Sequence, residues 1–250
     1  MRAMLFAAGL GTRLRPLTDR RPKALVEVAG RPLLEWALLK LKASGVEQVV
    51  VNVHHFSGMI REFLRSEKNF GMEVFISDES DLLLDTGGGL KKAQAFFEKT
   101  DQPFIAMNVD VLSTIDLPSL YDSHLQSGAM ATLAVRKRES SRYLLFDEAM
   151  NLQGWQNVRT GEQKFCGAEL QLSQLTPLAF SGIHIISPAL FPFMPSAQQP
   201  FSIIDTYLVA GSQAVIKGFQ HDADFWLDVG KPGAVEEALQ RRDEWENGIR

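Results

Sequence analysis

Apolar runs and amphipathic segments alternate along the first 135 residues. Short apolar runs at residues 2–7, 46–53, 72–77 and 103–110 have the length and composition of strands. Residues 31–44 place five apolar side chains on one helical face, and the segments near 59–64 and after 87–89 show helical signals as well. Gly45 follows the first of these segments, where a glycine commonly ends a helix. The pattern predicts strands and helices that take turns.

The pattern changes after an apolar run at residues 130–136. Residues 140–147 and 151–158 have the alternation of two antiparallel strands, and a polar stretch follows up to Leu175. A strand at 177–187, a helix from Ile203, strands at 214–219 and 224–230, and a helix from about Lys231 complete the chain. The second half is therefore expected to be richer in β-structure and less regular.

Repeated strand–helix units with short connections predict an α/β fold. We expect a Rossmann-like mixed, mainly parallel sheet with helices on both faces, and a small β-rich lobe. No linker interrupts the sequence, so residues 1–250 are predicted to form a single domain with a first half (1–135), the lobe (136–230) and a C-terminal helix (231–250). Such sheets bind ligands beyond the carboxyl ends of their strands, which directs attention to the loops there.

Composition narrows the possible partners. The 26 basic and 30 acidic residues leave a formal charge of −4, which gives no general field for nucleic acid or for an anionic membrane. Cys166 is the only cysteine, which excludes an intramolecular disulfide and suits a reducing compartment. No apolar stretch approaches the roughly 20 residues that span a bilayer. We expect a cytoplasmic protein without nucleic-acid or membrane partners, whose anion sites are local.

The strongest chemical signal is the block LFAAGLGTRLRPLTDRRPKAL at residues 5–25. It places two glycines, several arginines and Lys23 directly after a strand. Glycines let the backbone approach a phosphate closely, and arginine offers a forked, permanently charged set of donors. The spacing differs from that of a P-loop, and Leu14 stands where a dinucleotide loop needs a third glycine. A tight turn with a solvated basic face is the alternative for a bare GxG.

The longer block resembles a known family. GxGTRLxPLT followed by PKxL is the N-terminal signature of the sugar-1-phosphate nucleotidyltransferases, the nucleotide-diphosphate-sugar pyrophosphorylases. The resemblance implies the nucleotide-diphospho-sugar transferase fold, with nucleotide binding in residues 1–135 and sugar binding in residues 136–230. It implies that the loop holds the phosphates of an NTP and that the lysine contacts the reacting phosphate. The residues concerned are Ala7, Ala8, Gly9, Gly11, Thr12, Arg13 and Lys23.

A second glycine segment is LLLDTGGGLKKA at residues 82–93. Three consecutive glycines open a predicted helix and leave one wall without side chains, against which a flat base can lie. GGG alone is equally typical of a flexible turn or a helix start. In the resembled family a TGGG or TAGA stretch packs against base and ribose, which makes Gly87 and Gly88 candidates for the nucleotide site. Asp85 and Thr86 are weaker candidates.

Two aspartates follow strand ends. Asp110 comes after Asn108 and Val109, and Asp228 ends the strand at 224–230. Two carboxylates without histidine suit magnesium in a metal–NTP complex better than zinc, although either aspartate alone is also typical of a turn or a helix cap. The resemblance implies that Asp110 and Asp228 share Mg²⁺ and that Asn108 lies at the nucleotide. The segment NVD departs from the usual GD and changes the backbone freedom beside Asp110.

The segment Phe180-Ser181-Gly182-Ile183 resembles the FSGI stretch that lines the sugar side of the cleft in this family. Ser181 and Gly182 are therefore candidates for sugar binding, although glycine in a strand is equally often a bulge position. Asn52, after another strand, is a further sugar-side candidate. His54 and His55 lack partners at metal-ligand spacing, so we interpret them as structural.

These residues predict an in-line displacement. A phosphate oxygen of a sugar 1-phosphate attacks the α-phosphorus of an NTP, and pyrophosphate leaves. Arg13, Lys23, Asp110 and Asp228 are the predicted catalytic residues, and no general base is needed because the attacking phosphate is already anionic. The predicted partners are an NTP and a sugar 1-phosphate, with a monomer or a homodimer left open.

The resemblance does not settle base or acceptor. The LxDTGGG, FSGI and WxDVG segments look most like N-acetylmuramate-1-phosphate uridylyltransferases, with mannose- and heptose-1-phosphate guanylyltransferases close to them. UTP with an N-acetylmuramate-type acceptor is the preferred prediction. A CTP-dependent phosphocholine-type cytidylyltransferase and a non-catalytic nucleotide-binding homologue remain alternatives, and residues 136–175 have no assigned role.

Overall fold

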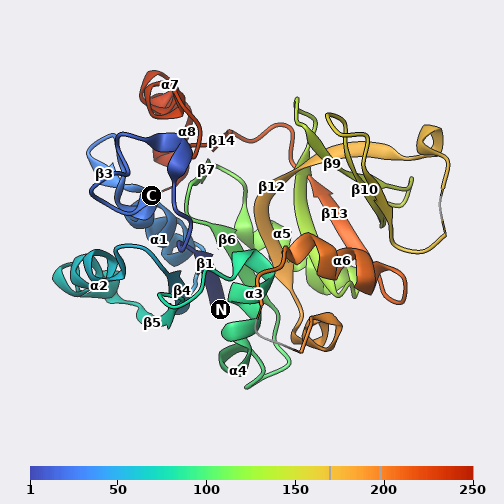
Figure 1. Ribbon diagram of the computed structural model, residues 1–250, viewed down its shortest axis with the longest axis horizontal. Helices are drawn as coiled ribbons and strands as arrows, with labels where there is room; N and C mark the ends of the chain where they lie inside the picture. Colours follow the sequence, from blue (N-terminus) through green and yellow to red (C-terminus); the bar gives the residue numbers. More distant parts are fainter. Residues whose placement is uncertain (169, 197–198, 250) are drawn as a thin grey trace. The chain divides into compact units, whose positions relative to one another are not determined.

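The computed structural model describes residues 1–168, 170–196 and 199–249, which form two compact units. The first unit contains Met1–Asp85, Ala106–Leu117 and Asp224–Arg250. The second contains Thr86–Ile105 and Pro118–Ala223. The two units are interleaved in sequence, because each is built from separate segments of the chain (Figure 1). A single domain with halves that meet near residue 135 stays a prediction.

Parallel strands form the centre of the first unit. β1 (Arg2–Phe6) pairs in parallel with β4 (Gln48–Val53), and β4 pairs in parallel with β5 (Glu73–Asp78). β6 (Phe104–Asn108) lies beside β1 in the sheet order. Because β1, β4 and β6 are buried almost throughout, their sequences are continuous apolar runs rather than alternating ones. The predicted α/β fold with parallel strands is confirmed in this unit.

Helices and short turns connect these strands. The first connection holds the 3₁₀ turns η1 (Thr12–Leu14) and η2 (Lys23–Leu25), the hairpin of β2 (Glu27–Val28) and β3 (Arg31–Pro32), and helix α1 (Leu33–Ala43). α2 (Ser57–Ser66) and the 3₁₀ turn η3 (Lys68–Gly71) connect β4 to β5. Gly45 has φ 80°, the left-handed conformation expected of a glycine that follows a helix.

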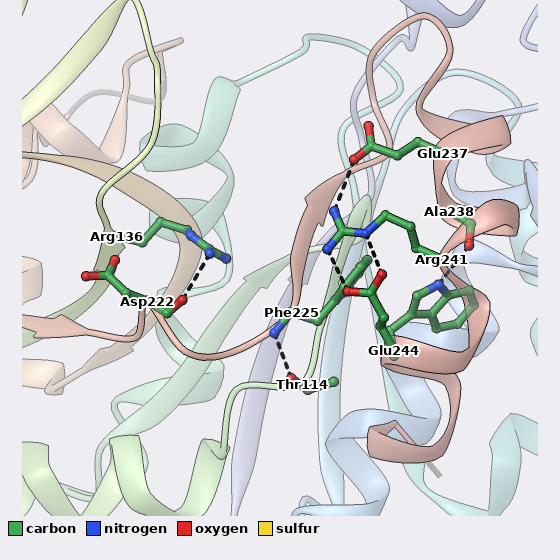
Figure 2. A network of polar contacts seen from close by, with 9 residues as sticks. Thr114, Arg136, Asp222, Phe225, Glu237, Ala238, Arg241 and Glu244 are labelled. Atoms are coloured by element: carbon green, nitrogen blue, oxygen red, sulfur yellow. Dashed lines mark hydrogen bonds and ion pairs between the residues drawn. The ribbon is translucent and has the colours of Figure 1, made fainter.

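An unpredicted antiparallel pairing joins distant parts of the first unit. β7 (Val111–Ser113) pairs antiparallel with β14 (Trp226–Asp228), so that Asp228 lies opposite Val111. Thr114 and Ser113 extend this contact, because the Phe225 amide donates to Thr114 Oγ1 at 3.0 Å and Ser113 Oγ donates to the Phe225 carbonyl at 2.9 Å. Figure 2 shows the bond between Phe225 and Thr114. The pairing brings residue 228 next to residue 110.

The C-terminal segment belongs to the core of the first unit. It forms α7 (Ala234–Gln240), α8 (Arg242–Trp245) and the 3₁₀ turn η6 (Glu246–Gly248), not one continuous helix. Trp245 is completely buried and meets Trp36 edge to face, with ring centroids 5.0 Å apart. Figure 1 shows these helices, in red, beside the blue N-terminal segments. The indole N–H of Trp245 donates to the Ala238 carbonyl at 2.9 Å.

The charged residues of this segment lie on its outer side. Arg241 pairs with Glu237 at 3.3 Å and with Glu244 at 2.7 Å, and its guanidinium lies over the ring of Phe225. Figure 2 shows Arg241 between the two glutamates. These bonds raise the pKa of Arg241, with the bond to Glu244 as the main cause. Solvent screening makes such pairs minor contributors to stability, and burial of Trp245 dominates.

The second unit is mixed and mostly antiparallel. β12 (Thr176–Ile186) pairs antiparallel with β8 (Ala131–Arg136) and with β9 (Arg142–Phe146), while β13 (Ile216–Gln220) pairs in parallel with β8. β10 (Leu152–Asn157) pairs antiparallel with β9 on one side and with β11 (Gln163–Phe165) on the other. The predicted antiparallel pair after residue 140 is confirmed, and β11 is an addition. The remaining elements are α3 (Asp85–Lys92), α4 (Gln94–Phe97), α5 (Leu117–Ser127), η4 (Leu172–Gln174), η5 (Pro188–Phe193) and α6 (Ile203–Gly211).

Three buried histidines are held by hydroxyl groups in the second unit. His124 bonds Thr132 and Ser187, each at 3.0 Å, His184 bonds Tyr207, and His221 bonds Ser181 at 2.7 Å. Burial lowers the pKa of His124 and of His221 to about 4, and that of His184 to about 3. All three rings are therefore neutral at pH 7.

In the described parts of the chain, no helix is long and apolar enough to cross a membrane.

Acid is expected to destabilise the second unit through these histidines. Their pKa is lowered on folding from about 6.5, so between pH 6.5 and pH 4 the unfolded chain binds more protons than the folded one. The free energy of unfolding should therefore fall as the pH drops through this window. His124→Asn should cost about 1–3 kcal/mol at pH 7.5 through lost hydrogen bonds, and should weaken the pH dependence. Urea unfolding at pH 7.5, 6 and 5 measures both effects. A wild-type free energy of unfolding that is constant across this range would contradict the assignment.

Candidate active site

The glycine loop follows β1 in the first unit. Gly9 is exposed, and Gly11 has φ 66°. A Cβ on Gly11 would stand 2.9 Å from both Lys23 Cβ and Thr18 Cγ2, so the position requires glycine for space as well as for conformation. Thr18 Oγ1 donates to the Gly11 carbonyl at 2.9 Å and fixes the loop. Thr12 and Arg13, in η1, are exposed. The loop therefore presents backbone and a guanidinium to solvent.

The start of the loop is anchored by Asn52. Asn52 Oδ1 accepts hydrogen bonds from the backbone amides of Ala7 at 2.7 Å and Ala8 at 3.3 Å. These amides are thus already bonded within the protein. Asn52, predicted on the sugar side, is only 2% exposed, and its role in sugar binding stays a prediction. Its observed contacts hold the start of the glycine loop.

Lys23 connects the loop to the first aspartate. Its Nζ lies 2.6 Å from Asp110 Oδ2 in a salt bridge that is largely shielded from solvent. A Cβ on Gly9 would be 3.5 Å from the same Nζ, so the lysine side chain crosses the glycine loop. Asp110 follows β6 and its Asn108, and the Phe6 carbonyl accepts a hydrogen bond from the Val109 amide at 3.1 Å. The loop after β1 and the loop after β6 thus meet, as expected for the carboxyl edge of parallel strands.

Gly230 marks the point where the charged groups converge. A Cβ on this buried glycine would collide with Asp110 Oδ2 and would stand 2.9 Å from Asp228 Oδ1 and 3.3 Å from Arg13 Nη2. The two carboxylates and the arginine therefore surround one small volume. The Gly230 amide donates to Asp228 Oδ1 at 2.9 Å, and Lys231 Nζ lies 3.5 Å from Asp228 Oδ2. The four predicted catalytic residues are brought together within the first unit.

The remaining candidates lie in the second unit. Gly87 and Gly88 are buried at the start of α3, where the amide of Gly87 donates to the Phe201 carbonyl at 2.9 Å. A Cβ on Gly87 would collide with the Phe201 ring, so the glycine is needed for this packing. Gly182, with φ 73°, lies in a bulge of β12, and Ser181 is fully buried with its hydroxyl on His221. Contact of these residues with a substrate stays a prediction.

The donor set favours a hard cation. Among the described residues, no group of three or more histidine, cysteine, aspartate or glutamate side chains could hold a metal. Asp110 and Asp228 supply carboxylate oxygens, and the Lys23 ammonium already neutralises one of them. Magnesium keeps several waters and substrate phosphates as ligands, so two carboxylates suit it, whereas a structural zinc site needs four protein ligands.

A nucleotidyl transferase family model matches residues 2–244, which is nearly the whole chain. The chain belongs to the nucleotidyl transferase family. The transferase is 33% identical over 241 residues to an N-acetylmuramate α-1-phosphate uridylyltransferase of Caulobacter vibrioides, covering 93% of each chain. It is 29% identical over 245 residues to one of Neisseria meningitidis, covering 98% of this chain and 100% of that protein. A mannose-1-phosphate guanyltransferase of Gibberella zeae is 31% identical over 239 residues, covering 93% of this chain but only 61% of that protein.

Solved structures show the same fold. HddC from Yersinia pseudotuberculosis complexed with GMP-PN superimposes with a TM-score of 0.76 at 22% identity, covering 96% of the transferase and 99% of HddC. A UDP-glucose pyrophosphorylase complexed with UDP-glucose gives a TM-score of 0.75 at 16% identity, covering 97% and 98%. The predicted fold and family are confirmed.

Two residues of the site were not found from the sequence. Gly230 ends the WxDVG segment, but a glycine shortly after a strand is usually a turn residue, and no local signal indicates that three charges converge on it. Glu79 is completely buried and binds Asn52 Nδ2 at 2.7 Å. Its place among polar residues in SDESD is typical of an exposed turn, so only the tertiary contact reveals it.

Gly230→Ala tests the convergence point directly. The methyl group would displace Asp110 and Asp228, and turnover by the transferase should fall about a hundredfold, since a misplacement of roughly 1 Å costs on that order. Steady-state kinetics and thermal unfolding of the same preparation measure the effect. Gly58→Ala is the matched control, because its Cβ meets nothing within 4 Å, and it should leave turnover unchanged. Wild-type turnover in Gly230→Ala would refute the claim that the site has no room for a side chain.

Proposed function

We propose that this protein transfers a nucleoside monophosphate from an NTP to a sugar 1-phosphate and releases pyrophosphate, with UTP and an N-acetylmuramate-type acceptor as its substrates. The observation that carries the proposal is the cluster of Arg13, Lys23, Asp110 and Asp228 around Gly230. Two cations and two carboxylates beside a glycine loop suit a triphosphate and its counter-ion. Family membership supports the reaction class.

Charge and position explain how these residues would act. Arg13 is exposed and donates from a planar fork, which suits the oxygens of a phosphate chain. Lys23, held across the glycine loop, places a point charge beside the same chain. The attacking sugar phosphate is already ionised, so these groups need only align it and neutralise charge that develops on the leaving pyrophosphate. No nucleophilic side chain or general base is required.

Asp110 and Asp228 would hold Mg²⁺. Their oxygens face one small volume, and the ammonium of Lys23 on Asp110 shows that this carboxylate accepts a positive partner at 2.6 Å. A bound magnesium ion would supply Lewis-acid polarisation of the phosphate oxygens. Lys231 Nζ lies 3.5 Å from Asp228 Oδ2 and partly offsets the negative charge of the two aspartates.

The preference for uridylyl transfer rests on the relatives. The two N-acetylmuramate α-1-phosphate uridylyltransferases align over 93% and 100% of their own lengths, whereas two of the mannose-1-phosphate guanyltransferases align over 61% of theirs. The identity of 33% over 241 residues to the Caulobacter vibrioides enzyme supports UTP and an N-acetylmuramate-type acceptor as the first candidate. GTP with a mannose-type acceptor is the second candidate, since identities of 29% and 31% to that group are comparable.

Pyrophosphate release tests the substrate assignment. Purified protein with Mg²⁺ is combined with UTP, GTP, CTP, ATP or dTTP and with a panel of sugar 1-phosphates that includes N-acetylmuramate, glucose and mannose, plus phosphocholine. The expected result is turnover with UTP and N-acetylmuramate 1-phosphate above every other pair. Preferred turnover with GTP and mannose 1-phosphate would replace the substrate assignment, and no turnover with any pair would contradict the reaction class.

Asp110→Asn and Asp228→Asn test the proposed metal site. Each removes one carboxylate charge, and kcat should fall by about two to three orders of magnitude, the usual size for loss of an electrostatic group at the reacting centre. The exposed Asp101→Asn is the matched control and should retain wild-type kcat. Titration with Mg²⁺ should show that either variant needs a higher metal concentration than the wild type. Unchanged kcat and Mg²⁺ dependence in both variants would remove these aspartates from the metal site.

A further inference from the structure

A buried polar relay lies behind the glycine loop. Glu79 is completely buried one residue beyond the end of β5, and its Oε1 accepts a hydrogen bond from Asn52 Nδ2 at 2.7 Å. Its Oε2 accepts one from the Leu84 backbone amide at 3.0 Å. Asn52 in turn accepts hydrogen bonds from the amides of Ala7 and Ala8. The relay therefore runs from residue 84 through two side chains to the start of the loop.

The direction of each hydrogen bond in this relay follows from the backbone amides at its two ends, which can only donate. The carbonyl oxygen of Asn52 must face the amides of Ala7 and Ala8, so its NH₂ group faces Glu79. Both oxygens of Glu79 act as acceptors, Oε1 from Asn52 and Oε2 from the Leu84 amide. A glutamine at position 79 has one acceptor oxygen in place of two, so it cannot accept from Asn52 and from Leu84 at the same time. The carboxyl group of Glu79 thus matches the one orientation of Asn52 that binds the loop.

Backbone contacts make the relay rigid. The Glu79 amide donates to the Val53 carbonyl at 2.7 Å, and His54 Nδ1 lies 2.6 Å from the Glu79 carbonyl oxygen. These bonds tie the chain after β5 to the chain after β4. Both side chains are thereby attached near the carboxyl ends of the paired parallel strands β4 and β5, which is the arrangement that holds a site in place.

We propose that Asn52 and Glu79 are positioning residues for nucleotide binding, which set the conformation of the glycine loop through the polarity of this relay. The inference rests on the proposed function, because it assigns the loop to the NTP. Both residues act through Ala7 and Ala8, which directly precede Gly9, and not by contact with the phosphates. Loss of the relay should therefore weaken binding of NTP more than binding of the sugar phosphate.

Swapping the amide of Asn52 and the carboxyl group of Glu79 between the two positions tests the direction of the hydrogen bonds in the relay. Asn52→Asp sets two acid groups against each other, and Glu79→Gln leaves either Asn52 Nδ2 or the Leu84 amide facing a second donor. Each single variant should raise KM for the NTP about tenfold or more, the effect of losing one well-formed buried hydrogen bond. In the double variant Asn52→Asp/Glu79→Gln, the introduced carboxylate would accept from Ala7, from Ala8 and from the NH₂ group of the introduced glutamine. The carbonyl oxygen of that glutamine would accept from Leu84. The four hydrogen bonds of the relay are then formed again, and KM for the NTP should recover.

Two outcomes of these kinetics would overturn the inference. A double variant whose KM for the NTP is no better than that of the two single variants refutes the polarity, as do single variants with wild-type KM. If the single variants do not fold, a folded double variant with near wild-type KM supports the relay, and a double variant that fails to fold refutes it. Tyr121→Phe, which loses a partly buried O–H to carbonyl bond in the second unit, is the control for general destabilisation and should leave KM unchanged.

Hydrogen exchange separates this inference from the proposed function. The Ala7 and Ala8 amides should exchange faster in both single variants and slowly again in the double variant, whether or not a substrate has been found. Wild-type protein that releases no pyrophosphate would contradict the proposed function while this measurement still tests the relay. Unchanged exchange of Ala7 and Ala8 in the single variants would refute the relay in a fully active enzyme.

Discussion

The charged centre of this protein depends on a position that has no room for a side chain. Gly230 lies where Asp110, Asp228 and Arg13 converge, and a single methyl group there would overlap a carboxylate oxygen. Like charges at this distance repel, and the structure offsets that repulsion with Lys23 at 2.6 Å and Lys231 at 3.5 Å. The two lysines and the arginine make a pair of neighbouring aspartates tolerable in the folded protein.

This centre can exist only because three remote segments are held together by backbone. Parallel pairing of β1 with β4, and β6 beside β1, aligns the loops that carry Gly9, Lys23 and Asp110. The antiparallel pairing of β7 with β14 then sets Asp228 beside the same loops. The C-terminal helices hold β14 in place, since Trp245 and Trp36 pack in one core with Leu227 and Val229. The charged residues of the C-terminal segment thus lie on the outer side of helices whose buried side packs against β14.

Buried polar side chains fix the structure around candidate site residues at two places. In the first unit, the Glu79 carboxylate and Asn52 hold the start of the glycine loop, and in the second unit His221 holds Ser181 within the bulge of β12. In both places a candidate ligand-binding residue is a framework group whose polar atoms already bind the protein. Such networks are costly when half satisfied, which is why they specify one backbone arrangement.

The sequence by itself determined the elements and the chemical class. Apolar runs and helical periodicity predicted the parallel strands of the first unit, the antiparallel strands after residue 140 and the glycine loop, because these depend on local patterning. It also predicted Arg13, Lys23, Asp110 and Asp228, whose residue types and positions after strands point to phosphate and metal chemistry. Only the tertiary structure decided that Gly230 lies among them, that Glu79 is buried, and that the C-terminal segment is part of a core. These features depend on contacts between residues far apart in sequence, such as 110 with 228 and 36 with 245, and local periodicity contains no record of such contacts.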